Sequence, residues 1–230
     1  MIAGHYATAL IAHQNSPKGT LLFFLLASQF QDLLWFMFHY LGFENTTPAD
    51  VFDATISNMT VAMTYSHDLL PLLVWAVVIF LIGKLVFKRT TIGLVALALF
   101  SSHAVLDFFS GHGHNVYGTD TQAVGLGLYA TNAYLATLIA AVFIIAALTY
   151  YFRAEAKEGV VRSKKHRWAI IGVFIYGIVF MLSIASVSFR DLFGLPLLNF
   201  GFNTTVPAII LTYIAMTAVL YWAVPKTATT

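Results

Sequence analysis

The chain has 230 residues, of which 59% are hydrophobic, 15% are aromatic and only 10% are charged. Soluble domains carry about 25% charged residues, and a mean hydropathy of +0.80 is typical of a protein that crosses a membrane several times. The composition excludes disorder, collagen and coiled coil, and the absence of cysteine excludes disulfide frameworks, thiol catalysis and cysteine-based zinc sites. A net charge of +2 is too small to indicate a nucleic-acid partner.

Six apolar segments approach or exceed the roughly 20 residues that a helix needs to cross a bilayer. They cover residues 20–43, 69–87, 90–110, 125–152, 168–189 and 204–224. A shorter segment, Ile2 to Gln14, has no basic leader and no small-residue cleavage site, so we interpret it as a helix that dips into the membrane rather than a signal peptide. The sequence therefore predicts an all-α polytopic membrane helix bundle, with residues 1–230 forming a single integral membrane domain. It has six spanning helices plus a short N-terminal membrane-embedded helix.

The basic residues predict which loops face the cytoplasm. Six of the twelve Lys and Arg residues lie within residues 153–167 and three lie within residues 84–89, while Lys18 and Lys226 lie in two further segments. If all these segments are cytoplasmic, every span alternates correctly and only Arg190 is left outside. The predicted arrangement is a multi-pass protein of a bacterial or archaeal cytoplasmic (inner) membrane, with the N-terminus out and the C-terminus in.

Several ionisable residues lie inside the apolar segments, where each costs on the order of 2.5–3.5 kcal/mol at the centre of a span and calls for a reason. Five of them come from four separate helices: His5, Asp32, His67, His103 and Asp107. At a helical rise of about 1.5 Å per residue, all five lie about 18–26 Å above the predicted cytoplasmic edge, in the outer half of the bilayer. Their common depth predicts that they converge on one site.

The strongest local motif is the pair His103 and Asp107, whose i, i+4 spacing places both side chains on one helix face. The pair presents an imidazole nitrogen and a carboxylate oxygen, which are ligand types that zinc and other divalent cations accept. A cation would also neutralise Asp32 and Asp107, since no Lys or Arg lies at this depth in any predicted span. The loop pair His112 and His114 is expected to add one ligand, with His112 preferred. The sequence therefore predicts one or two divalent ions, zinc first, with the ligands His5, Asp32, His67, His103, Asp107 and His112.

Catalytic and substrate-binding roles are predicted for a smaller set. Asp32, His67 and Asp68 are the candidate catalytic residues, with Asp32 as a bridging carboxylate or general base. Asp68 has two alternatives, which are a carboxylate that supports the metal ligands from behind and a plain solvated carboxylate. Arg190 is the only basic residue of the predicted outer loops and is the candidate to hold a substrate anion, with an interfacial salt bridge as the alternative.

Four motifs resemble the YdjM-like family of bacterial inner-membrane metal-dependent hydrolases. They are Gly4-His5, the segment from Gln29 to Trp35, Tyr65-Ser66-His67, and Ser102-His103 through Asp107-Phe108. The likeness covers about residues 1–130 by motif and the rest only by hydropathy. That family is distantly similar to zinc-dependent phospholipases C, in which a His-x-x-x-Asp helix and a further His downstream bind a cluster of zinc ions. By this resemblance His103, Asp107 and His112 would take those places, and the ligands completing the shell would be His5, Asp32 and His67.

These observations predict a metal-dependent hydrolase, acting in the outer half of the membrane on a phosphoester of a lipid or lipid-linked substrate. Residues 1–130 would carry the site and residues 131–230 would add further spanning helices. Two alternatives stay open. One is a proton-coupled transporter in which Asp32 and Asp107 form a relay. The other is a non-enzymatic membrane protein with a structural metal site, which would have closed coordination.

Overall fold

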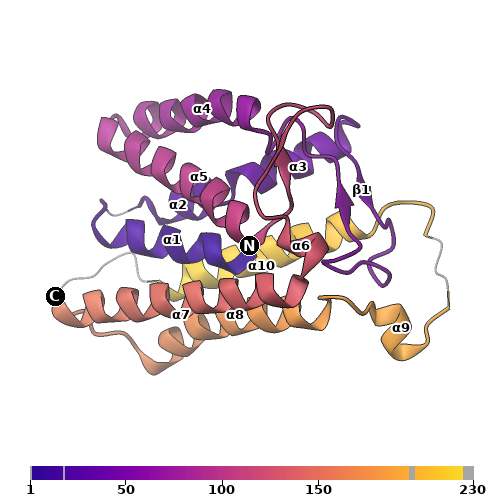
Figure 1. The fold of residues 1–230 in the computed structure, drawn as a ribbon. Helices are drawn as coiled ribbons and strands as arrows, with labels where there is room; N and C mark the ends of the chain where they lie inside the picture. Colours follow the sequence, from indigo (N-terminus) through magenta and orange to yellow (C-terminus); the bar gives the residue numbers. More distant parts are fainter. Residues whose placement is uncertain (1, 18, 197–199, 225–230) are drawn as a thin grey trace.

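The computed structural model describes residues 2–17, 19–196 and 200–224, and helices dominate it (Figure 1). The helices of these residues are α1 (Ile2–Gln14), α2 (Leu21–Ser28), α3 (Phe30–Tyr40), α4 (Leu69–Phe87), α5 (Thr90–Ser110), α6 (Leu128–Thr131), α7 (Ala133–Lys157), α8 (Lys164–Ser183), α9 (Phe189–Phe193) and α10 (Thr205–Ala223). Two short antiparallel hairpins pair β1 (Thr46–Thr47) with β2 (Thr60–Val61), and β3 (His114–Asn115) with β4 (Ala123–Val124). The predicted all-α bundle is confirmed.

Five helices, α4, α5, α7, α8 and α10, are each long and apolar enough to cross a membrane. Helices α2 and α3 together make a sixth candidate span, which is bent by 64° at the break between them. The apolar segment 20–43 is therefore a broken helix. Within the apolar segment 125–152, the long helix α7 begins only at Ala133. The residues before it belong to the connection that follows β4 and to the short helix α6. The chain is a multi-pass membrane protein.

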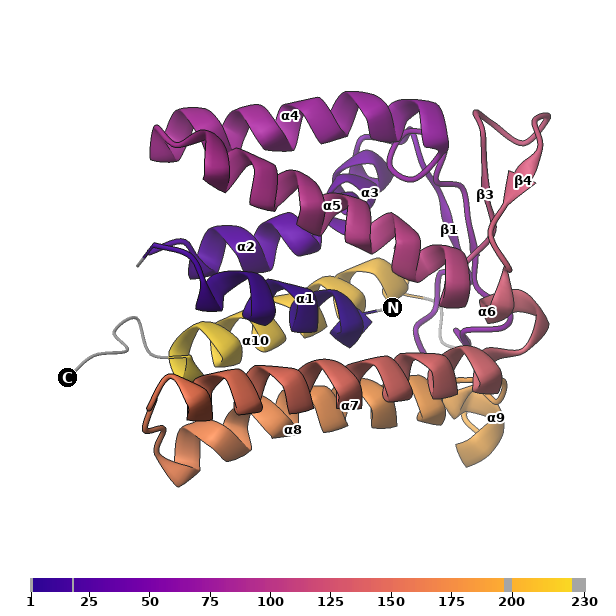
Figure 2. The ribbon, with the colours of Figure 1, turned by 60° about the vertical axis from the view of Figure 1, so that its left-hand side comes forward.

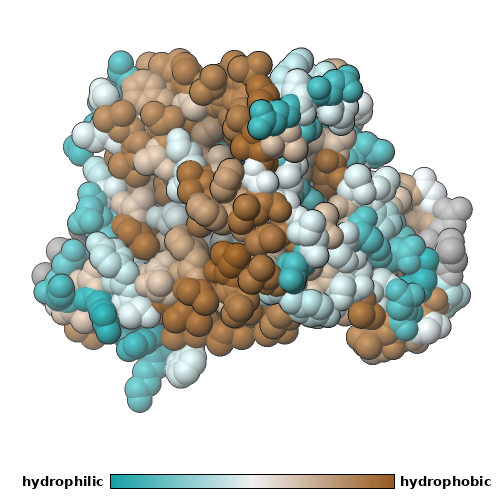
Figure 3. All heavy atoms as spheres, viewed as in Figure 1, coloured by the Kyte–Doolittle hydropathy of each residue, from teal (hydrophilic) through white to brown (hydrophobic). Residues whose placement is uncertain are grey.

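The outward faces of the long helices are apolar, as contact with lipid requires. On α4, for example, Leu73, Val74 and Leu85 are 66%, 62% and 68% exposed. Figure 3 shows apolar residues across the middle of one face of the molecule, over the long helices, and hydrophilic residues at its two ends. An exposed apolar band between two polar ends is the surface that a bilayer covers.

Helix α1 lies at the centre of the bundle. It packs against α2, α5, α7 and α8, and Figure 2 shows it between the α4–α5 pair and the α7–α8 pair. The contact with α8 is close enough to require glycine at position 177, since a Cβ atom there would lie only 2.5 Å from the Cβ of Ala3. The predicted short embedded helix is thus enclosed by protein, and this position carries His5 into the interior.

The connections gather at two ends of the bundle (Figure 1). The end that holds the α4–α5 and α7–α8 turns, here the inner end, carries the two basic segments 84–89 and 153–167. Lys18 and Lys226, which belong to the same charge prediction, lie outside the described residues. The other end, here the outer end, holds the long connections α3–α4, α5–α7 and α8–α10. The side of the membrane that each end faces stays a prediction.

The connection between α3 and α4, residues 41–68, covers the outer end and is fixed there by backbone hydrogen bonds. The Ile56 amide donates to the Ile184 carbonyl over 2.7 Å, and the Thr204 amide donates to the Ala49 carbonyl over 2.7 Å. These bonds join the connection to the end of α8 and the start of α10. It is therefore an ordered wall above the bundle.

Candidate metal centre

The structure brings together all five residues that share a predicted depth. His5 Nε2 lies 3.3 Å from Asp107 Oδ1, and His103 Nε2 lies 3.2 Å from Asp107 Oδ2. His67 Nε2 lies 3.4 Å from Asp32 Oδ1, and His103 Nε2 lies 3.7 Å from Asp32 Oδ2. All five side chains are buried. They form one connected cluster, here called the His/Asp cluster.

The local folding of two segments explains this convergence. His103 and Asp107 lie one turn apart on the buried face of α5. Asp32 lies in the first turn of α3, just after the break that separates α3 from α2. The same break leaves the carbonyl of Ser28 at the end of α2, where a helix cannot satisfy its own acceptors. That carbonyl accepts a hydrogen bond from His103 Nδ1 over 2.8 Å.

The hydrogen bonds around two of the histidines fix which ring nitrogen faces the cluster. A carbonyl only accepts, so His103 Nδ1 carries the proton that it donates to Ser28. The Ser66 hydroxyl donates to Glu44 Oε2 over 2.9 Å, so its oxygen accepts from His67 Nδ1 over 2.7 Å. In the neutral form of each ring, Nε2 is then the unprotonated nitrogen, and it faces the carboxylates. Such outer partners are what metal-ligating histidines have in proteins.

Several buried imidazole nitrogens of this region have no hydrogen-bond partner among the described residues. They are both ring nitrogens of His5 and the Nε2 atoms of His103, His112 and His114. A buried polar atom without a partner costs about 1–3 kcal/mol. A divalent cation would satisfy one ring nitrogen of His5 and the Nε2 of His103, and imidazole nitrogen with carboxylate oxygen is a donor set that zinc accepts. The residues present therefore fit a metal ion.

Two sets of three ligand atoms lie within 4.8 Å of one another and share His103: His5, His103 and Asp107 form one set, and Asp32, His67 and His103 form the other. Because the Nδ1 of His103 is bonded to Ser28, only its Nε2 can bind a metal, and it can bind one ion. A second ion would need another donor. Three protein ligands per ion leave a position for water, as in catalytic zinc sites.

The loop after α5 places His112 and His114 beside the cluster. The ring of His114 stacks on His67 with 5.2 Å between centroids, and the ring of His112 meets Tyr129 at 5.1 Å. Burial lowers the pKa of His112 to about 4 and the pKa of His114 to about 3. Both rings are therefore neutral near pH 7 and can offer a lone pair. Neither ring belongs to the two sets of ligand atoms described above, although both line the cavity beside the cluster. The preference for His112 as a ligand therefore stays a prediction.

Sequence reasoning missed Tyr213 of α10. Its hydroxyl donates to Asp32 Oδ2 over 2.5 Å, while its own carbonyl accepts from the Tyr6 hydroxyl of α1 over 3.1 Å. The contact orients the Asp32 carboxylate. No signal in the sequence distinguishes this residue, because tyrosine in a spanning helix is ordinarily a packing or interface residue.

Asp68, a candidate catalytic residue, has a different role in the structure. Its Oδ1 accepts from the Asn115 amide over 2.9 Å and its Oδ2 accepts from the Gly118 amide over 2.6 Å. Both oxygens thus hold the β3–β4 hairpin, which begins at His114. The structure therefore shows Asp68 positioning this hairpin, and its predicted catalytic role stays a prediction.

Arg190, the candidate for a substrate anion, lies away from the cluster. It donates to Asp50 and to Asp53, each over 2.6 Å. It does not line the cavity next to the cluster. Its charge is neutralised by two carboxylates of the α3–α4 connection, so the alternative of an interfacial salt bridge describes it, with partners that the sequence did not indicate.

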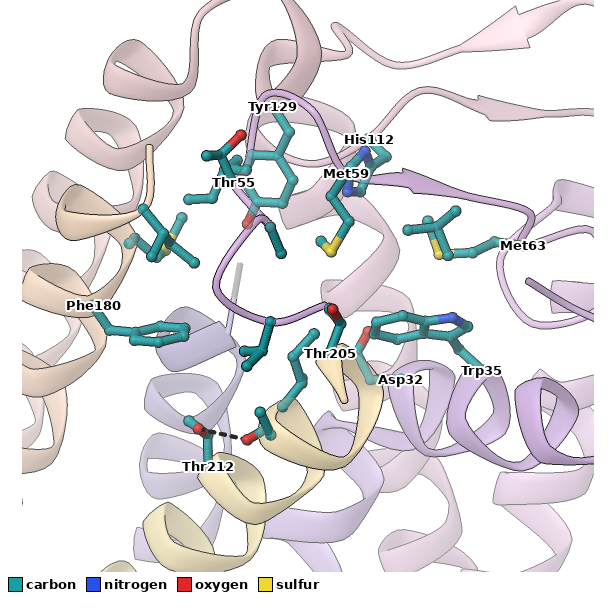
Figure 4. A pocket seen from close by; sticks show the side chains of 18 of the residues that line it. Asp32, Trp35, Thr55, Met59, Met63, His112, Tyr129, Phe180, Thr205 and Thr212 are labelled. Carbon is teal, nitrogen blue, oxygen red and sulfur yellow. Dashed lines mark hydrogen bonds between the residues drawn. The ribbon is translucent and has the colours of Figure 1, made fainter. Parts of the chain in front are cut away.

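The cluster opens into a cavity whose empty space, including the part that is open to solvent, is about 1040 Å³. Its polar part is formed by Asp32, His67, Asp107, His112, His114 and Tyr213, and the remaining wall comes mainly from apolar residues of the α3–α4 connection, α8 and α10. Figure 4 shows Asp32 and His112 on one side of the cavity and Phe180 and Thr212 on the other. The His/Asp cluster therefore lies at one side of an apolar chamber.

No protein-family model, curated protein or solved structure matches the chain. The site itself offers a buried donor set suited to a divalent cation and an apolar cavity beside it.

Proposed function

We propose that this chain is a membrane-embedded metal-dependent hydrolase that uses zinc or another divalent cation. The observation that carries the proposal is the convergence of five buried His and Asp side chains. Among the described residues, both ring nitrogens of His5 and the Nε2 of His103 have no hydrogen-bond partner. The cation would be held by His5, His103 and Asp107 and, in a second position or as further ligands, by Asp32 and His67. His112 and His114 line the cavity beside these residues and could supply a further ligand.

When bound, a divalent cation lowers the pKa of a water molecule from 15.7 toward about 7 and polarises the oxygen of the group under attack. The residues of the chain supply the remaining functions. His67 Nδ1 donates to the Ser66 hydroxyl and His103 Nδ1 donates to the Ser28 carbonyl, so that the Nε2 of each ring is the atom left to bind a cation. Tyr213 holds Asp32 Oδ2. Where His5, His103 and Asp107 hold the cation, Asp32 Oδ1 would be the base that accepts a proton from water, and where Asp32 is itself a ligand it would position the cation instead.

The proposed substrate is a phosphoester of a lipid or lipid-linked molecule. Three points support this choice: the cluster lies within a membrane bundle, its cavity is apolar, and the sequence motifs resemble a family of inner-membrane metal-dependent hydrolases. With the basic loops in the cytoplasm, as their charge predicts, the reaction would take place in the outer half of a bacterial or archaeal inner membrane.

Elemental analysis of protein purified in detergent or nanodiscs tests the metal, with wild type beside Asp32→Ala and His103→Ala. We expect one or two divalent ions per chain in wild type and a clear loss in both variants. Hydrolysis of soluble phosphodiester, phosphomonoester and carboxylic ester probes then tests the activity. Folded wild-type protein that holds no stoichiometric metal would contradict the proposal. Metal that stays bound without any hydrolysis would point to a structural site.

A further inference from the structure

The part of the cavity away from the His/Asp cluster has a wall that offers a ligand almost nothing but hydrocarbon. We infer that this part binds one hydrocarbon chain of a membrane lipid, with the reacting group of that lipid at the cluster. The inference rests on the proposed function for the identity of the reacting end. The chain-binding site itself rests on the wall of the cavity.

The cavity forms where two membrane helices separate. Helices α8 and α10 are in contact at Gly177, where an added Cβ would lie 3.7 Å from Met216 Cε. One turn closer to the outer end, Phe180 of α8 and Thr212 of α10 already line the cavity. It continues along α10 as far as Thr205, about 10 Å at 1.5 Å per residue. The space is thus elongated along the helices, as a lipid chain is.

The wall carries no fixed positive charge, because none of the described residues that line the cavity is Lys or Arg. Two of the three threonines of the wall also use their hydroxyl protons internally. Thr212 Oγ1 donates to the Ala208 carbonyl over 3.0 Å, and Thr205 Oγ1 donates to the Pro48 carbonyl over 2.7 Å. Figure 4 shows the Thr212 bond. These two residues therefore present mainly methyl groups to the cavity.

The apolar part of the wall combines flexible and rigid side chains. Met59, Met63 and Met181 line it together with Phe180 and Ile209. Methionine adapts its shape to what lies beside it, so the wall can pack closely against a hydrocarbon chain. A chain of eight or more carbons would therefore make more van der Waals contacts with the wall than a short one. A short or charged ligand would gain little.

Photolabelling tests the inference without requiring catalysis. The probe is a dodecyl phosphonate with a diazirine at the end of the chain, added to metal-loaded protein in nanodiscs of ether lipids. We expect the label on residues 180–184 and 205–212, and we expect excess unlabelled dodecyl phosphonate, but not butyl phosphonate, to remove it. Labelling confined to outward-facing residues such as Leu73 and Leu138, whatever the competitor, would overturn the inference.

Two substitutions with a matched control sharpen the test. Ala208→Trp fills the cavity and is expected to lower labelling at least fivefold, while Ala218→Trp is the control because Ala218 lines a different groove on α10. Phe180→Ala enlarges the cavity and should move the preferred competitor to longer chains. Unchanged labelling in a folded Ala208→Trp variant would also overturn the inference.

The same preparations separate this inference from the proposed function. If Ala208→Trp keeps its metal and its hydrolysis of a soluble phosphodiester but loses long-chain probes, both proposals are supported. If wild type places the label in the cavity but holds no metal and hydrolyses nothing, the proposed function fails and the chain-binding site stands.

Discussion

The two ends of the bundle each bury charged side chains, and they satisfy them in different ways. At the inner end, Arg162 forms a close ion pair with Glu155, with side-chain exposures of 5% and 10%, and also donates to the Tyr151 hydroxyl and the Ala223 carbonyl. At the outer end, the Asp32 carboxylate lies among imidazoles and a tyrosine hydroxyl, none of which carries a permanent charge. The charges of the inner ion pair are satisfied within the protein, and the contacts of Arg162 join α7 to the end of α10. The cluster at the outer end leaves ring nitrogens of His5 and His103 without a hydrogen-bond partner among the described residues, and its groups could hold a cation.

The largest expected effect is the loss of His103, which belongs to both sets of ligand atoms. His103→Ala should lower hydrolysis below about 1% of wild type, because losing a ligand costs more than the 10- to 100-fold typical of an outer partner. The metal content should fall with it, as measured by elemental analysis, while circular dichroism stays helical. His39→Ala is the matched control, since His39 lies outside the cluster on α3. Full activity in folded His103→Ala would contradict the metal centre.

At the inner end, the expected effect is on stability rather than on metal. Arg162→Ala leaves the buried Glu155 without its partner, and breaking such a pair costs about 3–5 kcal/mol. The melting temperature in detergent should fall, and the metal content of the protein that remains folded should equal that of wild type. A double variant that also carries Glu155→Ala should recover part of the loss. Metal loss in Arg162→Ala at full helicity would show that the two ends are coupled.

Tyr213→Phe tests whether α10 takes part in the chemistry of the outer end. The substitution removes only the hydroxyl that donates to Asp32, so the metal content should be kept and kcat should fall about 10- to 100-fold. The pH profile of kcat should also shift, because the Asp32 carboxylate loses the hydrogen bond that the hydroxyl donates to it. A merely structural Tyr213 would change stability and leave the pH profile in place. Tyr6→Phe is the control from the same group of contacts.

Much of the cluster could be predicted because helices and bilayers have fixed dimensions. The rise per residue and a charged edge give His5, Asp32 and Asp107 a common height without any knowledge of packing. Height gives no information about neighbours across the bundle. The contact of Tyr213 with Asp32, 181 residues away in the chain, could therefore not be predicted. The carbonyl of Ser28 becomes an acceptor only because a helix breaks within an unbroken apolar segment.

Outside the helices there is no fixed rise per residue from which the position of a side chain could be calculated. Asp68 adjoins His67 in the chain, yet its oxygens bind the amides of a hairpin formed far downstream. The spans themselves were predictable from hydropathy, whereas the start of α7 was not, because β4 and α6 occupy the apolar residues before Ala133. Loop geometry depends on contacts that exist only after the bundle has formed.

The smallest expected effect concerns Arg190, for which sequence and structure differ most clearly. The sequence indicates an anion-binding role for the single basic residue of the outer loops, and the structure pairs it with Asp50 and Asp53. Arg190→Gln should therefore change kcat and KM for a soluble phosphodiester less than about twofold, in line with a contact remote from the reacting group. The melting temperature should fall modestly, since the α3–α4 connection loses a tie to the segment before α10. A tenfold rise in KM with unchanged kcat would mean instead that Arg190 leaves its carboxylates to bind the substrate anion.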